Sequence, residues 1–135
     1  MDLIVTPIYT ALLALLFIVL SIRVILLRRD LWISLGDKGN PQLLRRQRVH
    51  GNFAEYVPFA LLLMVGAELM LTPKWIIHAL GVALLLGRLA HAYGVSREPE
   101  SLFLRSVGMV LTFIVLFAGA LTCLVQSYRM AGFAG

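Results

Sequence analysis

The 135-residue chain is 60% hydrophobic and only 14% charged, and its formal net charge is +5. A soluble domain is about half apolar and about a quarter charged, so this composition excludes the soluble class and indicates an integral membrane protein. The apolar runs are long enough for helices that cross a bilayer, and they lack the alternation of barrel strands. The single cysteine, Cys123, excludes an intrachain disulfide.

The first predicted helix covers residues 3–27 and consists mainly of Leu, Ile, Val, Ala and Phe. No basic region precedes this run and no small-residue cleavage motif follows it, so we expect a retained span rather than a signal peptide. Arg23 lies near the end of the run, where its long side chain can reach the lipid headgroups. The second helix is predicted over residues 41–71, because Asn40 suits an N-cap and Pro41 suits a first turn.

The second helix is about 45 Å long at ~1.5 Å per residue, which exceeds the ~30 Å hydrocarbon layer. Its first turns should therefore project into water. The third helix is predicted over residues 74–93, where Gly94 suits a C-cap. The fourth helix is predicted over residues 101–128, and its Gly108 and Gly119 allow close helix approach.

These elements predict one domain, residues 1–135, that forms an all-α membrane bundle of four helices. Four spans place both termini on one side and the connections between helices one and two and between helices three and four on the other. Most basic residues gather on that second side: Arg28, Arg29, Lys38, Arg45, Arg46, Arg48, Arg88, Arg97 and Arg105. The opposite side offers Lys74 and Arg129. The positive-inside rule therefore predicts cytoplasmic connections and non-cytoplasmic termini.

The second helix carries a polar face where it enters the membrane. At ~100° per residue, its polar residues share about a third of the helix circumference. These residues are Arg45, Arg48, Asn52, Glu55 and Tyr56, whereas His50 points to the opposite side. Polar groups at this depth are costly and are functional by default. Guanidinium forks suit carboxylates and a carboxylate suits an ammonium group, so the face fits a ligand that has both. The arginines alone would also fit lipid-headgroup binding together with topology signalling, but that interpretation does not explain Asn52, Glu55 and Tyr56 on the same face.

The pattern Arg48-x-x-x-Asn52-x-x-Glu55-Tyr56-x-Pro58 resembles the signature of the MAPEG family, the membrane-associated proteins of eicosanoid and glutathione metabolism. Further matches are Val24, Ile25, Arg28 and Arg29 upstream, and Arg88, His91, Tyr93, Gly94 and Arg105 downstream. The resemblance covers nearly the whole chain and is to short, bacterial-type members. It implies a homotrimer of four-helix subunits with glutathione sites between neighbours, which suits a His50 on the reverse face.

The resemblance implies a glutathione transferase or peroxidase that activates the glutathione thiol for attack on lipophilic electrophiles or hydroperoxides. A free thiol has a pKa near ~8.5, and the thiolate is the nucleophile. Arg105 matches the family arginine proposed to favour the thiolate, and Tyr93 is the competing candidate. The glutathione-binding residues that the resemblance implies are Arg28, Arg48, His50, Asn52, Glu55, Tyr56, Arg88 and His91.

The expected partners are glutathione as co-substrate, a lipophilic second substrate, the lipid bilayer and further copies of the chain in a homotrimer, with no nucleic acid. No metal is expected, because His50, His78 and His91 lack a ligand spacing with acids or cysteine. Two other functions stay open: a non-catalytic lipid- or partner-binding member of the same family, and a small four-helix exporter. The joint presence of the signature residues favours the enzyme. The first helix also lacks the membrane-embedded acid of such exporters.

Overall fold

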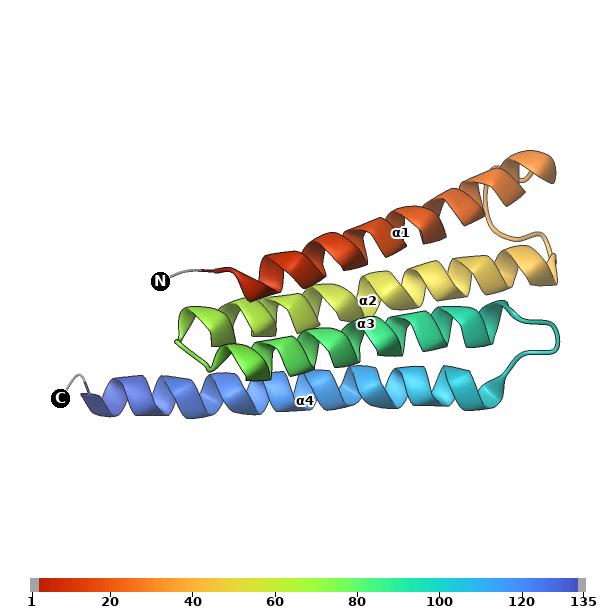
Figure 1. Cartoon of the computed structure of the whole chain (residues 1–135). Helices are drawn as coiled ribbons and strands as arrows, with labels where there is room; N and C mark the ends of the chain where they lie inside the picture. Colours follow the sequence, from red (N-terminus) through yellow and green to blue (C-terminus); the bar gives the residue numbers. More distant parts are fainter. Residues whose placement is uncertain (1–2, 134–135) are drawn as a thin grey trace.

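The computed structural model describes residues 3–133, and four helices account for most of them. These helices are α1 (Val5–Asp30), α2 (Pro41–Leu69), α3 (Lys74–Ser96) and α4 (Leu102–Phe133). Successive helices run antiparallel, so the chain ends lie at one end of the bundle and the α1–α2 and α3–α4 connections lie at the other (Figure 1). Each helix is long and apolar enough to cross a membrane, and residues 3–133 contain no strand, which confirms the all-α membrane prediction.

The start of α2 follows the predicted pattern. The side-chain oxygen of Asn40 accepts a hydrogen bond from the backbone N–H of Leu43 at 2.9 Å, and Pro41 occupies the first turn. The cap satisfies a backbone N–H that has no partner within the helix, while proline lacks that donor altogether. The local sequence therefore fixes where α2 begins.

The start of α1 depends on a residue that lies far away in the sequence. The carboxylate of Glu68, near the end of α2, accepts hydrogen bonds from the backbone N–H groups of Ile4 (2.8 Å), Val5 (2.6 Å) and Thr6 (2.7 Å). Glu68 is only 6% exposed. A negative charge is favourable at a helix N-terminus, so this buried carboxylate ties α1 to α2.

Several helix ends differ from the predicted ones. α3 continues to Ser96 rather than ending at residue 93, so Gly94 lies inside the helix and is not a C-cap. A Cβ at Gly94 would lie 2.7 Å from the backbone nitrogen of Arg105, so a glycine is needed because α4 begins against this turn of α3. α4 extends to Phe133 instead of residue 128, and α2 ends at Leu69 instead of residue 71.

The interior of the bundle is formed mainly by α2 and α3, each of which packs against the three other helices, whereas α1 and α4 do not touch. In the apolar part of α3, 44% of residues are buried, against 17% in α1. The core includes Met64, Ile77, Leu84 and Val115. Large apolar side chains such as Phe117 cover the outside, as expected for a surface that faces lipid chains.

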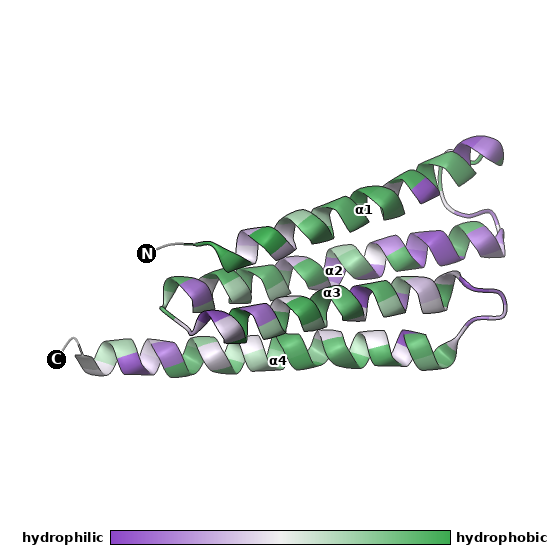
Figure 2. Cartoon of the chain, in the orientation of Figure 1, coloured by the Kyte–Doolittle hydropathy of each residue, from purple (hydrophilic) through white to green (hydrophobic). Residues whose placement is uncertain are grey.

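Polar residues concentrate at the end that holds the α1–α2 and α3–α4 connections, which we call the basic end (Figure 2). Trp32 follows α1 at this end, and Trp75 lies in the first turn of α3 at the other end. Their exposed fractions are 91% and 72%. Exposed tryptophans at opposite ends suit the two membrane–water interfaces.

Candidate functional site

A polar cavity of about 210 Å³ opens at the basic end between α2, α3 and the start of α4. We call it the α2–α4 cavity. Its lining residues are Leu44, Arg45, Arg48, Asn52, His91, Val95, Glu100 and Arg105. The structure thus brings together four of the predicted catalytic and glutathione-binding residues, from three helices, and adds Arg45 of the polar face; the four are Arg48, Asn52, His91 and Arg105.

Arg88 lies behind this cavity and holds two of its lining residues. It is 1% exposed, and its guanidinium donates hydrogen bonds to the Asn52 side-chain oxygen at 2.8 Å and to the Thr112 hydroxyl at 3.4 Å. It also lies 3.3 Å from Nδ1 of His91 and 5.7 Å from the centre of the Phe53 ring. Because a guanidinium can only donate, His91 Nδ1 accepts, and the neutral ring keeps its proton on Nε2. Asn52 and His91 are therefore fixed in orientation by one buried cation.

Close packing of α3 on α4 places Arg105 in the cavity. A Cβ at Gly108 would lie 2.5 Å from the carbonyl oxygen of Gly87 and 2.6 Å from the backbone nitrogen of His91. The close approach that the sequence predicted at Gly108 is therefore present. Arg105 lies one turn before Gly108 on α4, so this contact fixes its distance from His91.

Glu100 contributes the one carboxylate of the cavity and was not predicted. Its side chain lies 2.6 Å from the Arg105 guanidinium and 3.8 Å from that of Arg45, and Arg45 also lies 3.6 Å from Glu98. The only sequence signal was the placement of Glu98 and Glu100 on either side of Pro99. Arg105 is 52% exposed, and such pairs contribute about 0–1 kcal/mol, so an incoming carboxylate can replace Glu100.

Two predicted residues lie away from the cavity, toward α1. The guanidinium of Arg28 donates to backbone carbonyls of the α1–α2 connection, including that of Gly36 at 2.9 Å. His50 lies on the opposite face of α2 from Arg48, as the helical spacing requires. Its Nε2 lies 3.1 Å from the Ser21 hydroxyl, and its ring stacks on Phe17 at 4.7 Å.

Three further predicted residues line the outside of the bundle rather than the cavity. Glu55 is exposed. Tyr56 is half-buried with its ring against Phe113 at 5.5 Å. Tyr93 is 59% exposed, and the Arg97 guanidinium lies 5.6 Å from its ring centre. An exposed carboxylate on a membrane helix surface is expensive unless another chain covers it.

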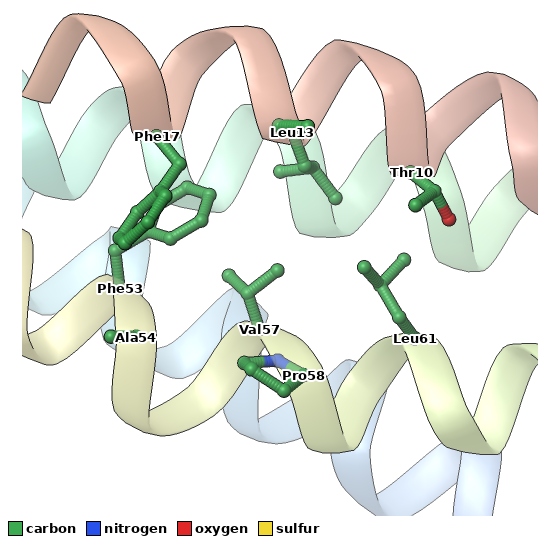
Figure 3. A pocket seen from close by; sticks show the side chains of 9 residues that line it. Thr10, Leu13, Phe17, Phe53, Ala54, Val57, Pro58 and Leu61 are labelled. Atoms are coloured by element: carbon green, nitrogen blue, oxygen red, sulfur yellow. The ribbon is translucent and has the colours of Figure 1, made fainter. Parts of the chain in front are cut away.

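An apolar cavity of about 260 Å³ lies on the other side of α2, between α1 and α2 (Figure 3). Its lining residues are Thr10, Leu13, Ala14, Phe17, Phe53, Ala54, Val57, Pro58 and Leu61. The hydroxyl of Thr10 donates to the carbonyl oxygen of Thr6 at 3.0 Å, so it is already satisfied. This cavity suits apolar groups and supplies no reactive side chain. No three His, Cys, Asp or Glu side chains cluster as metal ligands among the described residues.

Comparisons with known proteins agree with this fold. The sequence model described as "MAPEG family" matches residues 6–125. "Inner membrane protein YecN" of Escherichia coli (strain K12) is 40% identical over 90 residues, which cover 67% of this chain and 69% of that protein. The protein of the same name from Escherichia coli O6:H1 gives the same identity and coverage. The family match spans most of the chain and includes every residue of the α2–α4 cavity, and the chain therefore belongs to the MAPEG family.

Proposed function

We propose that the protein is a membrane-bound, glutathione-dependent transferase or peroxidase. The observation that carries this proposal is the α2–α4 cavity, in which Arg45, Arg48 and Arg105 face a single carboxylate, Glu100. Membership of a family of eicosanoid and glutathione metabolism makes glutathione the natural ligand. Glutathione has two carboxylates, one ammonium group and one thiol, and guanidinium forks bind carboxylates in a bidentate way.

Different cavity residues are suited to different groups of glutathione. Arg48 and Arg45 are suited to the carboxylates, and Asn52 and His91 Nε2–H offer further polar contacts whose orientation Arg88 fixes. When the Glu100 side chain moves away from Arg105, the Arg105 guanidinium becomes free to contact the glutathione sulfur. A nearby positive charge favours the thiolate over the thiol, which is the differential stabilisation that catalysis needs.

We further propose a homotrimer in which neighbouring subunits complete the site. The cavity volume of about 210 Å³ is below the ~300–1,000 Å³ that is usual for small-molecule sites. Glu55 and Tyr93 lie exposed on the membrane-facing surface, where a second copy would cover them. Arg28 and His50 lie toward α1, on the other side of α2, and would have to exchange their present partners, the Gly36 carbonyl and the Ser21 hydroxyl, for a neighbour's ligand. By the positive-inside rule, these sites face the cytoplasm.

In the proposed reaction, the thiolate sulfur forms a bond to the electrophilic carbon of a lipophilic substrate, and the leaving group departs with its electron pair. With a hydroperoxide, the sulfur attacks the terminal oxygen, the O–O bond breaks, and the alkoxide takes up a proton and leaves as an alcohol. The resulting glutathione sulfenic acid then reacts with a second glutathione to give glutathione disulfide and water. The bilayer supplies such substrates at high local concentration. Arg105 rather than Tyr93 is the residue assigned to the thiol, because Arg105 lines the cavity and the Tyr93 side chain does not.

A glutathione titration in detergent, paired with a turnover assay on a halo-nitroarene, tests the proposal. We expect saturable binding, turnover above the uncatalysed rate, and loss of binding in Arg48→Ala. Arg129→Ala, at the other end of the bundle, is the matched control and should behave as the parent. Binding without turnover would support the non-catalytic alternative, and absence of saturable binding by the trimer would refute a glutathione function.

A further inference from the structure

A second polar cavity lies at the basic end, bounded by α1, α2 and the segment that follows α3. Its volume is about 250 Å³. The lining residues are Arg23, Gln42, Arg45, Arg46, Ser96 and Glu98. We call it the arginine pocket. Toward this end of the bundle, α1 splays away from α2 (Figure 1).

Two of the three arginines in this pocket have only neutral partners. Arg46 donates to the backbone carbonyl oxygen of Arg23 at 2.7 Å, and Arg23 donates to the Ser96 hydroxyl at 3.1 Å. Arg45 pairs with Glu98 at 3.6 Å and with Glu100 at 3.8 Å. Within the described part of the chain, no carboxylate oxygen lies within ion-pair distance of Arg23 or Arg46. Two half-buried guanidinium groups therefore face the pocket without an ion pair of their own, because Glu98, the one carboxylate in its lining, pairs with Arg45.

The pocket lining carries three guanidinium groups and one carboxylate, so it has an excess of positive charge that a bound anion would offset. Arginines within membrane segments are costly and are usually paired, and two like charges side by side add repulsion. A phosphate group suits the site, because its several oxygens can accept from guanidinium forks on two different helices at once. The amide of Gln42 and the hydroxyl of Ser96 add neutral hydrogen-bonding groups around the same space.

The position of the pocket indicates the source of that phosphate. Arg23 lies seven residues before the end of α1, or about 10 Å into the helix from the basic end. Of its neighbours one turn away on α1, Val19 and Leu26 are 52% and 42% exposed, whereas Leu20 and Leu27 are buried, so Arg23 lies at the edge of the outward-facing surface of α1. A headgroup at Arg23 would place acyl chains along Val19 and the apolar surface beyond it. Basic pockets between membrane helices bind anionic headgroups in this way.

We propose that the arginine pocket binds the phosphate of an anionic phospholipid, with Arg23 and Arg46 as the two cationic ligands. The site is separate from the proposed glutathione site: Arg48, Asn52, His91 and Arg105 do not line it. Arg45 lines both cavities and stands between them. The lipid site does not depend on the proposed enzymatic function, so its test uses lipid binding alone.

The test is a thermal-unfolding titration of the purified protein in nonionic detergent, with bound lipids counted by native mass spectrometry. The titrants are phosphatidylglycerol, phosphatidylcholine with the same acyl chains, and glycerol 3-phosphate, which has the headgroup phosphate without the chains. The variants are Arg46→Gln and Arg23→Gln. Arg29→Gln is the matched control, because Arg29 is an exposed arginine of the same end that pairs with Asp30 and lies outside the pocket.

Phosphatidylglycerol should raise the unfolding temperature of the parent and of Arg29→Gln with saturation at one lipid per subunit. Arg46→Gln and Arg23→Gln should need at least roughly tenfold more phosphatidylglycerol for the same rise in unfolding temperature. This is the effect expected from the loss of one charge-assisted hydrogen bond. If a glutamine variant does not fold, Arg46→Lys keeps the charge without the fork and should bind several-fold more weakly. The site would be overturned if Arg46→Gln and Arg29→Gln bound phosphatidylglycerol equally well, or if phosphatidylcholine raised the unfolding temperature as much as phosphatidylglycerol does. An equal effect of glycerol 3-phosphate would overturn the lipid assignment and leave a soluble phosphate ester as the ligand.

Discussion

Gly108→Ala should push α4 away from α3 and damage both stability and the site. The added Cβ would lie 2.5 Å from the carbonyl oxygen of Gly87, 2.6 Å from the backbone nitrogen of His91 and 2.7 Å from His91 Cβ. Carbon atoms in ordinary contact are ~3.5–4.0 Å apart, so the helices must separate by about 1 Å. Two of these obstacles are backbone atoms, which cannot rotate away. Overpacking of this kind costs about 1–3 kcal/mol of unfolding free energy.

The same displacement should reach the proposed chemistry, because Arg105 lies one turn before Gly108. A misplacement of ~1 Å can cost about 100-fold in rate, so turnover should fall by about 10- to 100-fold. The assays are thermal unfolding in detergent and turnover with glutathione and a halo-nitroarene. Gly51→Ala is the stability control: a Cβ there meets nothing within 4 Å, and alanine favours a helix over glycine by about 1 kcal/mol. A Gly108→Ala protein with parental unfolding temperature and turnover would show that this contact does not position the site.

Three further variants test other parts of the account. Glu68→Gln should lower the free energy of unfolding by about 2–4 kcal/mol, and with it the unfolding temperature, because the carboxylate accepts three backbone hydrogen bonds. An unchanged transition in a calorimetric scan would show that Glu68 does not act as a cap of α1. Arg48→Ala should weaken glutathione binding by about 2–5 kcal/mol without changing the oligomeric state, and the same direction is expected for Glu55→Ala only if a neighbour completes the site as proposed; both are measured by titration and by mass in detergent. Arg88→Met should leave stability near that of the parent, since a buried cation is costly, but should weaken glutathione binding roughly tenfold because Asn52 loses its partner. Parental affinity in Arg88→Met would mean that this cation does not orient the site.

The sequence predicted those features that depend on neighbouring residues. The four helices follow from the length of the apolar runs, and Asn40 with Pro41 marks the start of α2 because the cap is formed within one turn. The polar face of α2, with His50 opposite, follows from helical spacing. Gly108 was predicted as a close contact because the lack of a side chain has the same consequence wherever the partner helix lies.

What the sequence did not predict depends on residues that are distant in the chain. Glu68 caps α1 across more than sixty positions, and no local pattern distinguishes it from an ordinary interfacial acid. Glu100 joins Arg45 and Arg105 only because the α3–α4 connection folds over the start of α2. Gly94 was misassigned as a helix end, since glycine serves equally at a C-cap and at a close helix contact. The pairing of Arg23 with Ser96 likewise required the packing of α1 near the end of α3.

The most direct test of the central claim is a pH titration of the thiolate absorbance of bound glutathione, in the parent, in Arg105→Ala and in Tyr93→Phe. With Arg105 beside the sulfur, the thiol pKa of bound glutathione in the parent should lie below the ~8.5 of a free thiol. Arg105→Ala should raise that pKa by about one unit or more and lower turnover, while glutathione affinity stays nearly parental. Tyr93→Phe should change the titration less, because the positive charge remains. A parental titration and parental turnover in Arg105→Ala would contradict the account, and a shift confined to Tyr93→Phe would assign thiol activation to the phenol.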